Sequence, residues 1–562
     1  MERIVRLFRR RLFLAVSGYL LASLLFLQAT QFFLQAAESA ELNRPNILLI
    51  LADDMGYSDV GCYGSEIATP NIDSLAAGGL RYSQFYNTAR CWPTRAALLT
   101  GYYAQQVNRD ALPKVKLPAE DNHTARHPAH RNRPAWSQLL PELLRPYGYS
   151  SYHSGKWHLD GQPLESGFEH SYMLLDDNRF FTAKNHVLDG QKLPEQTASD
   201  DYYATTAIAD HALRFLQEHE RKTPDRPFFQ YVAFTSPHFP LHAPAEDIAR
   251  YLHRYQIGWD AIRAARWERM QKMQMVSGSL SSLEPEIGTP YTHHFEAAAE
   301  RLGPGEINQE IPWDRLTAEQ QTFQAAKMAI HAAMIDRMDQ NIGRIVEQLR
   351  QSGDLDNTVI FVLSDNGASA EIMIRGDGHD PQAAPGSAGS YLCLGAGWSS
   401  AANTPFRRHK TWVHEGGVST PLVVHWPAGI EAAGQWRQAV GHVIDIAPTI
   451  ISLVGGQWPT MNAEHHVPPA PGRSLAPTFD KDQSADRRAV WWLHEENRAI
   501  RVGKWKLVAA KGEPWELYDL NSDRAETHNL AEDSPDRVVE LSQLWEDHVA
   551  EFAELRKYGY QP

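Results

Sequence analysis

Cys91 lies in a segment whose residue types favour an anionic side chain at a helix end. The segment reads C-W-P-T-R-A-A-L-L-T-G. Proline is favoured at the first helical position and glycine just past the last one, so Pro93 and Gly101 predict a short helix with Cys91 at its N-terminus. Free N–H groups there attract negative charge, and Arg95 follows one turn later. Taken alone, the segment better fits a buried cysteine before an ordinary helix.

Four hard oxygen ligands follow two apolar segments that read as buried strands, residues 46–51 and 358–363. They are Asp53, Asp54, Asp365 and Asn366. Carboxylate and amide oxygens suit Ca²⁺ or Mg²⁺ rather than a soft metal, and adjacent buried carboxylates repel each other without a cation. Asp-Asp alone would be interpreted as turn capping. Two such pairs, together with the Cys91 segment, predict a metal site.

Further polar motifs follow in a fixed order along the chain: G-K-W-H-L with Lys156 and His158, S-P-H with His238, and R-R-H-K-T-W-V-H-E-G-G with Lys410. With the two acidic motifs and the Cys91 segment, they resemble the type I sulfatases, and most closely the bacterial arylsulfatase-type members. The resemblance extends from about residue 46 to the C-terminus. It implies an α/β, alkaline-phosphatase-like fold: a large mixed, mostly parallel sheet flanked by helices, with a smaller C-terminal α+β domain.

The resemblance also implies a modified residue. In that family the cysteine matching Cys91 is oxidised to formylglycine by a maturation enzyme. Water converts the aldehyde into a diol, one hydroxyl attacks sulfur, and elimination of sulfate restores the aldehyde. The four oxygen ligands match the family's metal positions. Ca²⁺ is the usual occupant, Mg²⁺ is the alternative, and one oxygen of the modified Cys91 completes the metal shell.

Five further side chains receive roles from the resemblance. Arg95 is expected to fix the diol and an adjacent carboxylate, and Lys156 and Lys410 to bind the sulfate oxygens. His158 is the expected base for the elimination step, and His238 the expected acid for the leaving group. A single lysine is more often a surface charge and a single histidine more often structural, so these roles depend on the placement of each residue in its motif.

Cleavage of an aryl or carbohydrate sulfate ester has two alternatives: a phosphatase or phosphonate monoester hydrolase of the same superfamily, and a catalytically inactive binding homologue. A phosphatase of this fold typically uses Ser or Thr with zinc, which Cys91 argues against, whereas a phosphonate monoester hydrolase can share formylglycine. A catalytically inactive binding homologue would show a broken metal or lysine set, and no member of either set is missing. The sequence does not name the ester, because surface loops determine specificity.

Composition places the chain among globular proteins. It has 562 residues, 43% hydrophobic and 22% charged, with a formal net charge of −14, which argues against nucleic-acid binding. Residues 1–40 begin with arginines and continue as an uncharged apolar run, which predicts a cleaved signal peptide or, less favoured, an uncleaved anchor. We therefore expect export to the periplasm or the extracellular space. The three cysteines are too few for a disulfide scaffold, and Cys62 and Cys393 either pair or stay free.

Strand and helix patterns alternate through the first part of the chain. Helices are predicted near 135–147 and 202–218, with strands near 149–152 and 228–234, and Thr317-x-x-Gln320 fits a capping box for a long helix ending before Gly353. Such alternation predicts a mostly parallel sheet, whose ligands gather at the carboxyl ends of its strands.

The chain is divided by prediction into three regions. Residues 41–464 form the catalytic domain after the N-terminal segment, and residues 465–562 form a C-terminal α+β subdomain that begins with a Pro/His-rich linker. Strands are expected within 487–520 and a helix near 537–551. Residues 103–133 are expected to form an irregular loop over the site.

Overall fold

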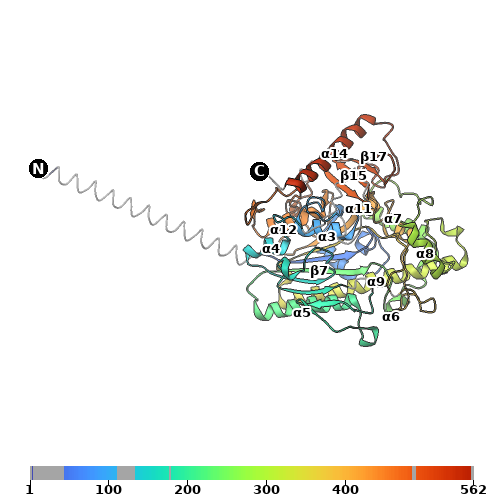
Figure 1. The fold of residues 1–562 in the computed structure, drawn as a ribbon, viewed down its shortest axis with the longest axis horizontal. Helices are drawn as coiled ribbons and strands as arrows, with labels where there is room; N and C mark the ends of the chain where they lie inside the picture. The colour runs from blue at the N-terminus through green and yellow to red at the C-terminus, as the bar shows by residue number, and fades with distance from the viewer. Residues whose placement is uncertain are drawn as a thin grey trace. The chain divides into compact units, whose positions relative to one another are not determined.

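An 11-stranded sheet forms the centre of the molecule (Figure 1). The computed structural model describes residue 3 and residues 44–110, 133–175, 179–376, 378–483 and 489–558. In spatial order the strands are β10 (Gln435–Arg437), β2 (Leu80–Tyr86), β9 (Ser419–His425), β8 (Thr358–Ser364), β1 (Asn46–Asp53), β7 (Phe228–Pro237), β3 (Ser150–Gly155), β4 (His170–Leu174), β5 (His186–Leu188) and β6 (Gln191–Lys192), with β11 (Gly441–His442) paired to β2. The strands from β8 to β4 run parallel, whereas β9 and β5 are antiparallel to their neighbours, so the sheet is mixed and mostly parallel as predicted.

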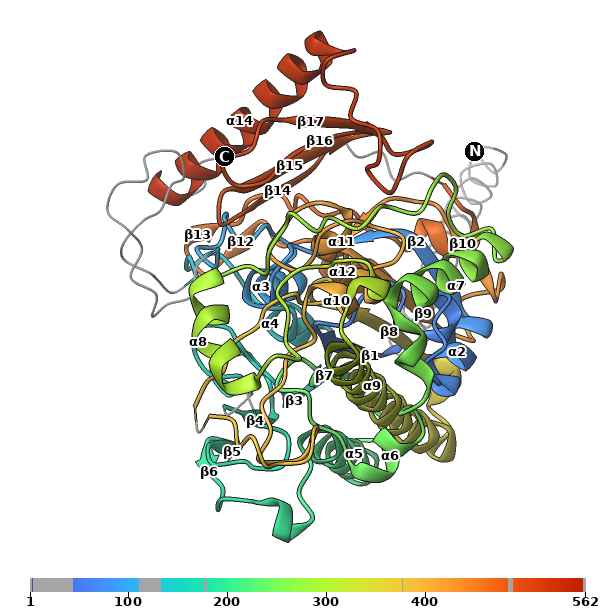
Figure 2. The same cartoon turned by 90° about the vertical axis from the view of Figure 1, so that its right-hand side faces the viewer.

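Strand β1 is buried on both faces, which explains its continuous apolar sequence. Leu48 and Ile50 point into one core and Leu49 into the other. The first core contains residues of α2 (Pro70–Ala77), α5 (Ala204–Lys222) and α9 (Ala318–Ser352), and the second contains residues of α3 (Cys91–Thr100), α4 (Leu140–Leu144) and α12 (Ile446–Leu453). Figure 2 shows these two helical layers on opposite sides of the sheet.

Helix α9 begins and ends where its sequence predicts. The backbone N–H of Gln320 donates to Thr317 Oγ1 at 3.2 Å, and the backbone N–H of Thr317 donates to Gln320 Oε1 at 2.9 Å. Gly353 ends the helix with φ 82°. The capping box and the glycine stop are thus both confirmed.

The helix predicted at 135–147 is shorter than expected. Only α4 and a following 3₁₀ turn occur there. Pro141 lies in the first turn of α4, where a proline fits, whereas a helix that started at residue 135 would have it in the interior, where it breaks the hydrogen bonding. Pro146 comes directly after Arg145, the C-cap of α4, so the α-helical hydrogen bonding stops at that point.

Helix α3 carries the Cys91 segment. Arg90 is its N-cap with extended backbone angles, and Gly101 ends it in the left-handed region with φ 74°. The prediction of a short helix from Cys91 to Gly101 is confirmed, although Pro93 is its third residue rather than its first. The N–H groups of the first turn therefore lie around Cys91.

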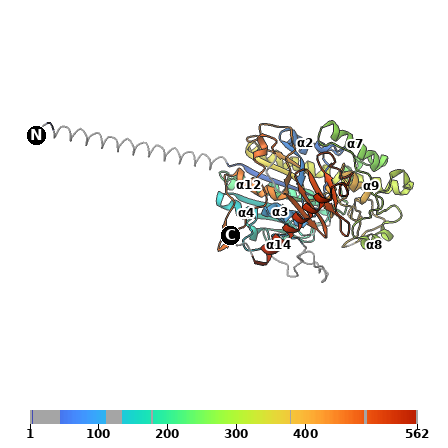
Figure 3. The ribbon, with the colours of Figure 1, turned by 90° about the horizontal axis from the view of Figure 1, so that it is seen from above.

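A four-stranded antiparallel sheet forms the C-terminal part, from β14 (Val490–His494), β15 (Asn497–Val502), β16 (Trp505–Ala509) and β17 (Glu516–Asp519). Helix α14 (Pro535–Tyr558) packs on its outer face, as Figures 1 and 3 show. These elements confirm the predicted strands and helix. Val490 and Trp492 share one hydrophobic cluster with Tyr86 of the central sheet, so this part packs firmly on the catalytic core.

The remaining helices lie in the connections between strands. They are α6 (Ala245–Ala249), α7 (Gly258–Lys272), α8 (Thr292–Leu302), α10 (Ala396–Ala402), α11 (Glu415–Val418) and α13 (Pro477–Asp480), and β12 (Met461–Asn462) pairs with β13 (His465–His466) in a short hairpin. The described residues from 46 onward form one compact unit. The predicted boundary at 464/465 stays a prediction.

Two predictions concern segments outside the described residues. These are almost all of the N-terminal segment 1–40 and residues 111–132 of the predicted loop 103–133. Among the helices that the structure describes, none combines the length and the apolar character needed to cross a membrane.

Candidate active site

The predicted polar side chains gather at the carboxyl edge of four neighbouring parallel strands. Asp53 ends β1, Asp365 directly follows β8, His238 follows β7 and Lys156 follows β3. Because β8, β1, β7 and β3 are adjacent in the sheet, residues distant in sequence meet at one edge. This is where ligands bind in parallel α/β sheets.

Cys91 joins the acidic residues from above the sheet edge, at the N-terminus of α3. Its thiol and one carboxylate oxygen each of Asp53 and Asp365 lie within 4.8 Å of one another. A second group with the same spacing consists of Asp53, Asp54 and His238. Asp53 belongs to both groups, so the structure brings the thiol, three carboxylates and an imidazole into one buried cluster.

Each of the three carboxylates is paired with a different cation. The pairs are Lys156 Nζ with Asp53 Oδ2 at 2.5 Å, Lys410 Nζ with Asp54 Oδ1 at 2.7 Å, and Arg95 Nη2 with Asp365 Oδ2 at 2.8 Å. All six side chains are buried. A second bond from Arg95 Nε to Asp365 Oδ2 at 3.1 Å fixes that guanidinium. Buried charges are stable only with such partners.

Burial raises the pKa values of the three aspartates, and the paired cations lower them. Burial, reinforced by Asp365, raises the pKa of Asp53. Burial also raises the pKa of Asp365, against the influence of Arg95. For Asp54 the desolvation is outweighed by Lys410 and His238, which together bring its pKa to about 2. A carboxylate that repels its neighbour in a buried site gains from an added cation.

Two buried oxygens of the cluster have no hydrogen-bond partner among the described residues. They are Asp53 Oδ1 and Asn366 Oδ1. The amide nitrogen of Asn366 donates to Asp54 Oδ1 at 2.6 Å, which fixes which side of that amide is the free acceptor. Unpaired buried acceptors are costly, and these two belong to a set of hard oxygen donors. The residues therefore fit a hard divalent cation.

His238 is held in one tautomer by a local hydrogen bond. Its Nδ1 lies 2.6 Å from the carbonyl oxygen of Phe239, which can only accept, so Nδ1 carries a proton. Nε2 then points toward Asp54, 3.8 Å from its Oδ2. Burial lowers the pKa of His238 to about 4, although Asp54 favours its protonated form. Nε2 can donate a proton only when the ring is an imidazolium.

His158 is half-buried and lies beside the Cys91 segment, with its ring centroid 6.1 Å from that of Trp92. Its backbone has φ 58°, in the left-handed region that favours glycine. A non-glycine residue in this region is uncommon and is often found at functional sites.

Glu371 and Arg90 are part of the cluster although the sequence did not single them out. Glu371 Oε1 lies 2.9 Å from Arg90 Nη1, and its Oε2 lies 3.2 Å from Lys410 Nζ. Glu371 therefore connects the residue before Cys91 with the lysine that pairs with Asp54. Its position six residues after Asp365 was the only signal available, and no general rule gives that spacing a meaning.

His494 is a third site residue that the sequence analysis missed. It ends β14 of the C-terminal sheet, is 4% exposed, and its ring centroid lies 5.7 Å from that of Trp92. Nothing in the local sequence marks it, because only the packing of the C-terminal sheet brings it against Trp92.

The other two cysteines lie away from this chemistry. Cys62, Cys91 and Cys393 are all buried free thiols, so the alternative in which Cys62 and Cys393 stay free describes the structure. Burial raises the pKa of Cys393 to about 12, and also raises that of Cys62. Of these three described cysteines, only Cys91 belongs to a group of potential metal ligands.

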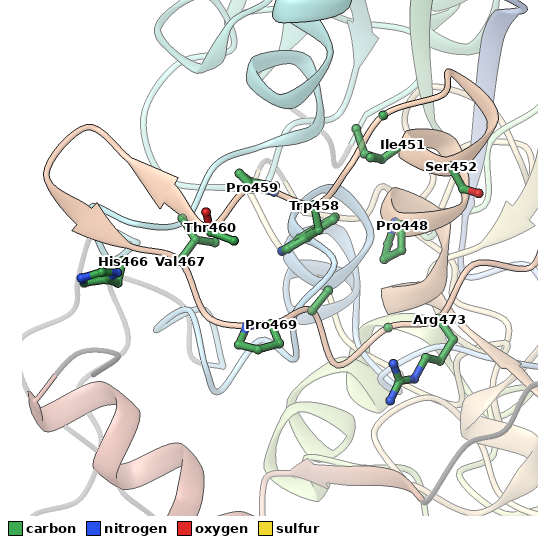
Figure 4. Close-up of a pocket in the computed structure, with 13 residues that line it drawn as sticks. Pro448, Ile451, Ser452, Trp458, Pro459, Thr460, His466, Val467, Pro469 and Arg473 are labelled. Atoms are coloured by element: carbon green, nitrogen blue, oxygen red, sulfur yellow. The ribbon is translucent and has the colours of Figure 1, made fainter. Parts of the chain in front are cut away.

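A separate pocket of about 570 Å³ lies at the other end of α3 (Figure 4). It is lined by Trp458, by Pro448 of α12 and by the hairpin residues His466 and Val467. Trp458 faces Gly101, the residue that ends α3. A ten-residue helix rises roughly 15 Å, so this pocket is well removed from Cys91. None of the predicted site residues lines it, and it is not the candidate active site.

The mostly parallel sheet, with a thiol, carboxylates and cations at its carboxyl edge, is the arrangement of an α/β enzyme site. Comparison with known proteins specifies the family. The sulfatase family model matches residues 45–456, and a model described as the C-terminal region of N-sulphoglucosamine sulphohydrolase matches residues 407–552. The chain belongs to the sulfatase family and is an enzyme that hydrolyses sulfate esters.

Two sequence relatives show the extent of the similarity. An uncharacterised sulfatase of Schizosaccharomyces pombe is 30% identical over 566 residues, covering 92% of this chain and 95% of the relative. Arylsulfatase of Klebsiella aerogenes is 30% identical over 468 residues, covering 78% of this chain and 93% of the relative. The predicted membership of the type I sulfatases is thus confirmed.

Solved structures support the fold. The crystal structure of Ps i-CgsB in complex with k-i-k-neocarrahexaose matches with a TM-score of 0.62 at 23% identity, covering 90% of this chain and 93% of that one. The structure of BT4656 in complex with its substrate D-glucosamine-2-N,6-O-disulfate matches with a TM-score of 0.58 at 22% identity, covering 92% of this chain and 100% of that one. The predicted alkaline-phosphatase-like fold is confirmed.

Proposed function

We propose that this enzyme cleaves an aryl or carbohydrate sulfate ester with Cys91, converted to formylglycine, as its nucleophilic residue, and with Ca²⁺ or Mg²⁺ as its metal. The observation that carries the proposal is the cluster itself: the Cys91 side chain lies within 4.8 Å of ligand oxygens of Asp53 and Asp365, at a helix N-terminus. A purely structural cysteine would not require carboxylates and a helix N-terminus around its side chain. Asp53, Asp54, Asp365 and Asn366 would hold the metal.

The modified residue would supply the attacking hydroxyl, and the metal would lower the pKa of that hydroxyl and neutralise charge. Arg95 holds Asp365 through two nitrogens and so keeps this carboxylate in place beside Cys91. Lys156 and Lys410 bring two buried positive charges to the sheet edge. We propose that they bind the sulfuryl oxygens, where preorganised cations stabilise developing charge.

We assign proton transfer to the two histidines. His238, once protonated at Nε2, would donate to the oxygen of the departing alcohol, and His158 would take the proton in the elimination that releases sulfate. The bond from His238 Nδ1 to Phe239 holds the ring so that Nε2 is the atom facing the acidic cluster. A bound anionic ester would favour the imidazolium form that this role requires.

The proposal is tested on protein coexpressed with a formylglycine-generating enzyme. We expect peptide mass spectrometry to find an aldehyde at position 91, and turnover of 4-nitrophenyl sulfate or a monosulfated sugar that Cys91→Ala abolishes. Full activity of protein carrying only the thiol would contradict the role of formylglycine. Faster turnover of a phosphonate monoester than of any sulfate ester would favour the phosphonate hydrolase alternative.

We also propose that the enzyme acts after export. The proposal rests on residues 1–40, where several arginines precede an uncharged apolar run. Intact-mass analysis of the protein recovered from a secretion-competent host tests it. A mature N-terminus near residue 40 is expected, and full-length protein retained in the cytoplasm would contradict it.

A further inference from the structure

The first hairpin of the C-terminal sheet places its turn beside the active site. His494 pairs with Asn497 across the hairpin, which leaves Glu495 and Glu496 as the turn, with φ 47° and 69°. Two-residue turns with positive φ at both positions are typical of Asn-Gly. Two glutamates at these positions are strained, and such strained residues are often found at functional sites.

His494 faces the residues around Cys91. Its ring lies against Trp92, the residue that follows Cys91. Nε2 of this buried ring has no hydrogen-bond partner among the described residues, and the nearest carboxylate oxygen, Glu495 Oε1, is 3.8 Å away. Burial lowers the pKa of His494 to about 4, against the opposing influence of Glu495, and the charges of Arg90 and Lys410 lower it further.

Glu495 extends this surface outward from the site. Tyr291 donates its hydroxyl to the Glu495 carboxylate, with 2.8 Å to each oxygen. The Arg90 guanidinium lies 5.7 Å from the Tyr291 ring centroid and 5.0 Å from that of Trp92. Glu495 is 41% exposed, so its carboxylate can accept further hydrogen bonds from a bound molecule.

We propose that His494, Glu495 and Tyr291 hold the alcohol part of the substrate, and that this alcohol is a saccharide with free hydroxyl groups and no second sulfate near the reacting one. The proposal rests on the proposed function, because it needs the sulfuryl group to bind at the metal ligands. It goes beyond that function by choosing between an aryl and a carbohydrate ester.

The chemistry of the three groups supports this choice. A carboxylate only accepts hydrogen bonds, and sugar hydroxyls are donors that match it. A second sulfate would meet the Glu495 charge, and Arg90 cannot offset it because that guanidinium already pairs with Glu371 at 2.9 Å.

The test compares two glutamates of the same turn. Glu495→Gln removes the negative charge and one of the two acceptor oxygens, and Glu496→Gln is its matched control, since Glu496 pairs with Lys511 at 2.6 Å. The substrates are galactose 6-sulfate, glucosamine 2-N,6-O-disulfate and 4-nitrophenyl sulfate. We expect Glu495→Gln to lower kcat/KM for galactose 6-sulfate roughly tenfold, mainly through KM, and to change 4-nitrophenyl sulfate much less.

Removal of the negative charge should also raise the ratio of kcat/KM for the disulfated sugar to that for the monosulfated sugar. Tyr291→Phe should also lower kcat/KM for the monosulfated sugar, as Glu495→Gln does, because it removes the hydroxyl that holds the Glu495 carboxylate in position. An equal effect of Glu495→Gln and Glu496→Gln on every substrate would overturn the proposal. So would a loss for 4-nitrophenyl sulfate as large as that for the sugar.

A binding measurement separates this inference from the proposed function. Calorimetry measures the Kd of galactose 6-sulfate for Cys91→Ala protein in the presence of Ca²⁺, and this measurement needs no turnover. Wild-type protein that cleaves no sulfate ester would refute the proposed function. The inference would still be tested by the Kd, which should rise roughly tenfold in Cys91→Ala/Glu495→Gln. An unchanged Kd in that variant would refute the inference alone.

Discussion

At the scale of single residues, the site is a set of compensated charges. Three carboxylates and three cations are buried together, and each cation contacts one carboxylate most closely. Removing one member of a buried ion pair leaves the other uncompensated, which costs about 3–5 kcal/mol. Loss of activity in such a variant therefore has to be separated from loss of folding.

Lys156→Ala and Lys410→Ala should each lower kcat for every sulfate ester by roughly 10²–10³-fold, because both lysines are proposed to act on the sulfuryl group that all substrates share. Steady-state kinetics with aryl and sugar sulfates check this, with circular dichroism to confirm folding. Lys511→Ala is the control, since Lys511 is an exposed lysine paired with Glu496. A loss restricted to one substrate would place that lysine in a specificity pocket instead.

His238→Ala should affect poor leaving groups most. Nδ1 of His238 donates to Phe239, so Nε2 can protonate an alcohol only from the imidazolium. Burial lowers the pKa of His238 to about 4, so the acidic form is depleted as the pH rises. For an alkyl sulfate, kcat/KM of the wild type should fall with rising pH, whereas a nitrophenyl sulfate should depend on pH much less.

The measurement for His238 is the dependence of rate on the acidity of the leaving alcohol across graded aryl sulfates. His238→Ala should make that dependence steeper than in the wild type. His158→Ala is the comparison variant: its proposed step follows departure of the alcohol, so it should slow all substrates alike. Equal slopes for His238→Ala and wild type would refute the assignment of the acid.

Much of the site was predictable from single residues, and the reason is local. Asp53 and Asp365 follow apolar strands directly, and parallel neighbours bring such positions to one edge. Cys91 has its helix signals within ten residues. Glu371 and His494 were not predictable, because a loop and a remote sheet place them and no local pattern records those contacts.

At the scale of elements, α3 positions Cys91 and is itself fixed at its other end. Gly101 has φ 74°, and a Cβ there would lie 2.7 Å from Trp458. Gly148 has a similar φ of 84° after a short helix, with no atom within 4 Å of its Cβ position. The two glycines differ mainly in the presence of that neighbour.

Gly101→Ala should therefore destabilise the protein more than Gly148→Ala. Both substitutions place a side chain in the left-handed region, which costs about 1 kcal/mol. Only Gly101→Ala adds overpacking against Trp458, worth a further 1–3 kcal/mol or so. Thermal unfolding with the two variants side by side measures the difference. Equal losses of Tm would show that Trp458 moves aside without cost.

Element boundaries were predictable where their signals are strong. The capping box at Thr317 and the stop at Gly353 located a 35-residue helix to within one residue at each end. The helix predicted at 135–147 was too long because its apolar pattern continues across prolines that end regular helix. Local steric rules outweigh apolar periodicity there.

At the scale of the whole molecule, the C-terminal sheet is tied to the catalytic core by buried charge as well as by apolar packing. Lys506 of β16 lies 2.8 Å from Glu415 of α11 and 2.8 Å from Glu526. Glu415 belongs to the same motif as Lys410. The two parts of the chain are thus coupled through the motif that delivers a site lysine, which composition and periodicity could not show.

Metal binding should stabilise the whole unit, because the ligands come from two strands and the cluster leaves Asp53 Oδ1 and Asn366 Oδ1 without hydrogen bonds. A ligand that binds only the folded state adds about 2.7 kcal/mol at one hundred times its Kd. Ca²⁺ added to chelator-treated protein should therefore raise Tm in a concentration-dependent way and restore turnover. Asn366→Ala should reduce both effects. Recovery with Zn²⁺ alone would contradict a hard-metal site and favour the phosphatase-like alternative, since zinc prefers nitrogen and sulfur ligands.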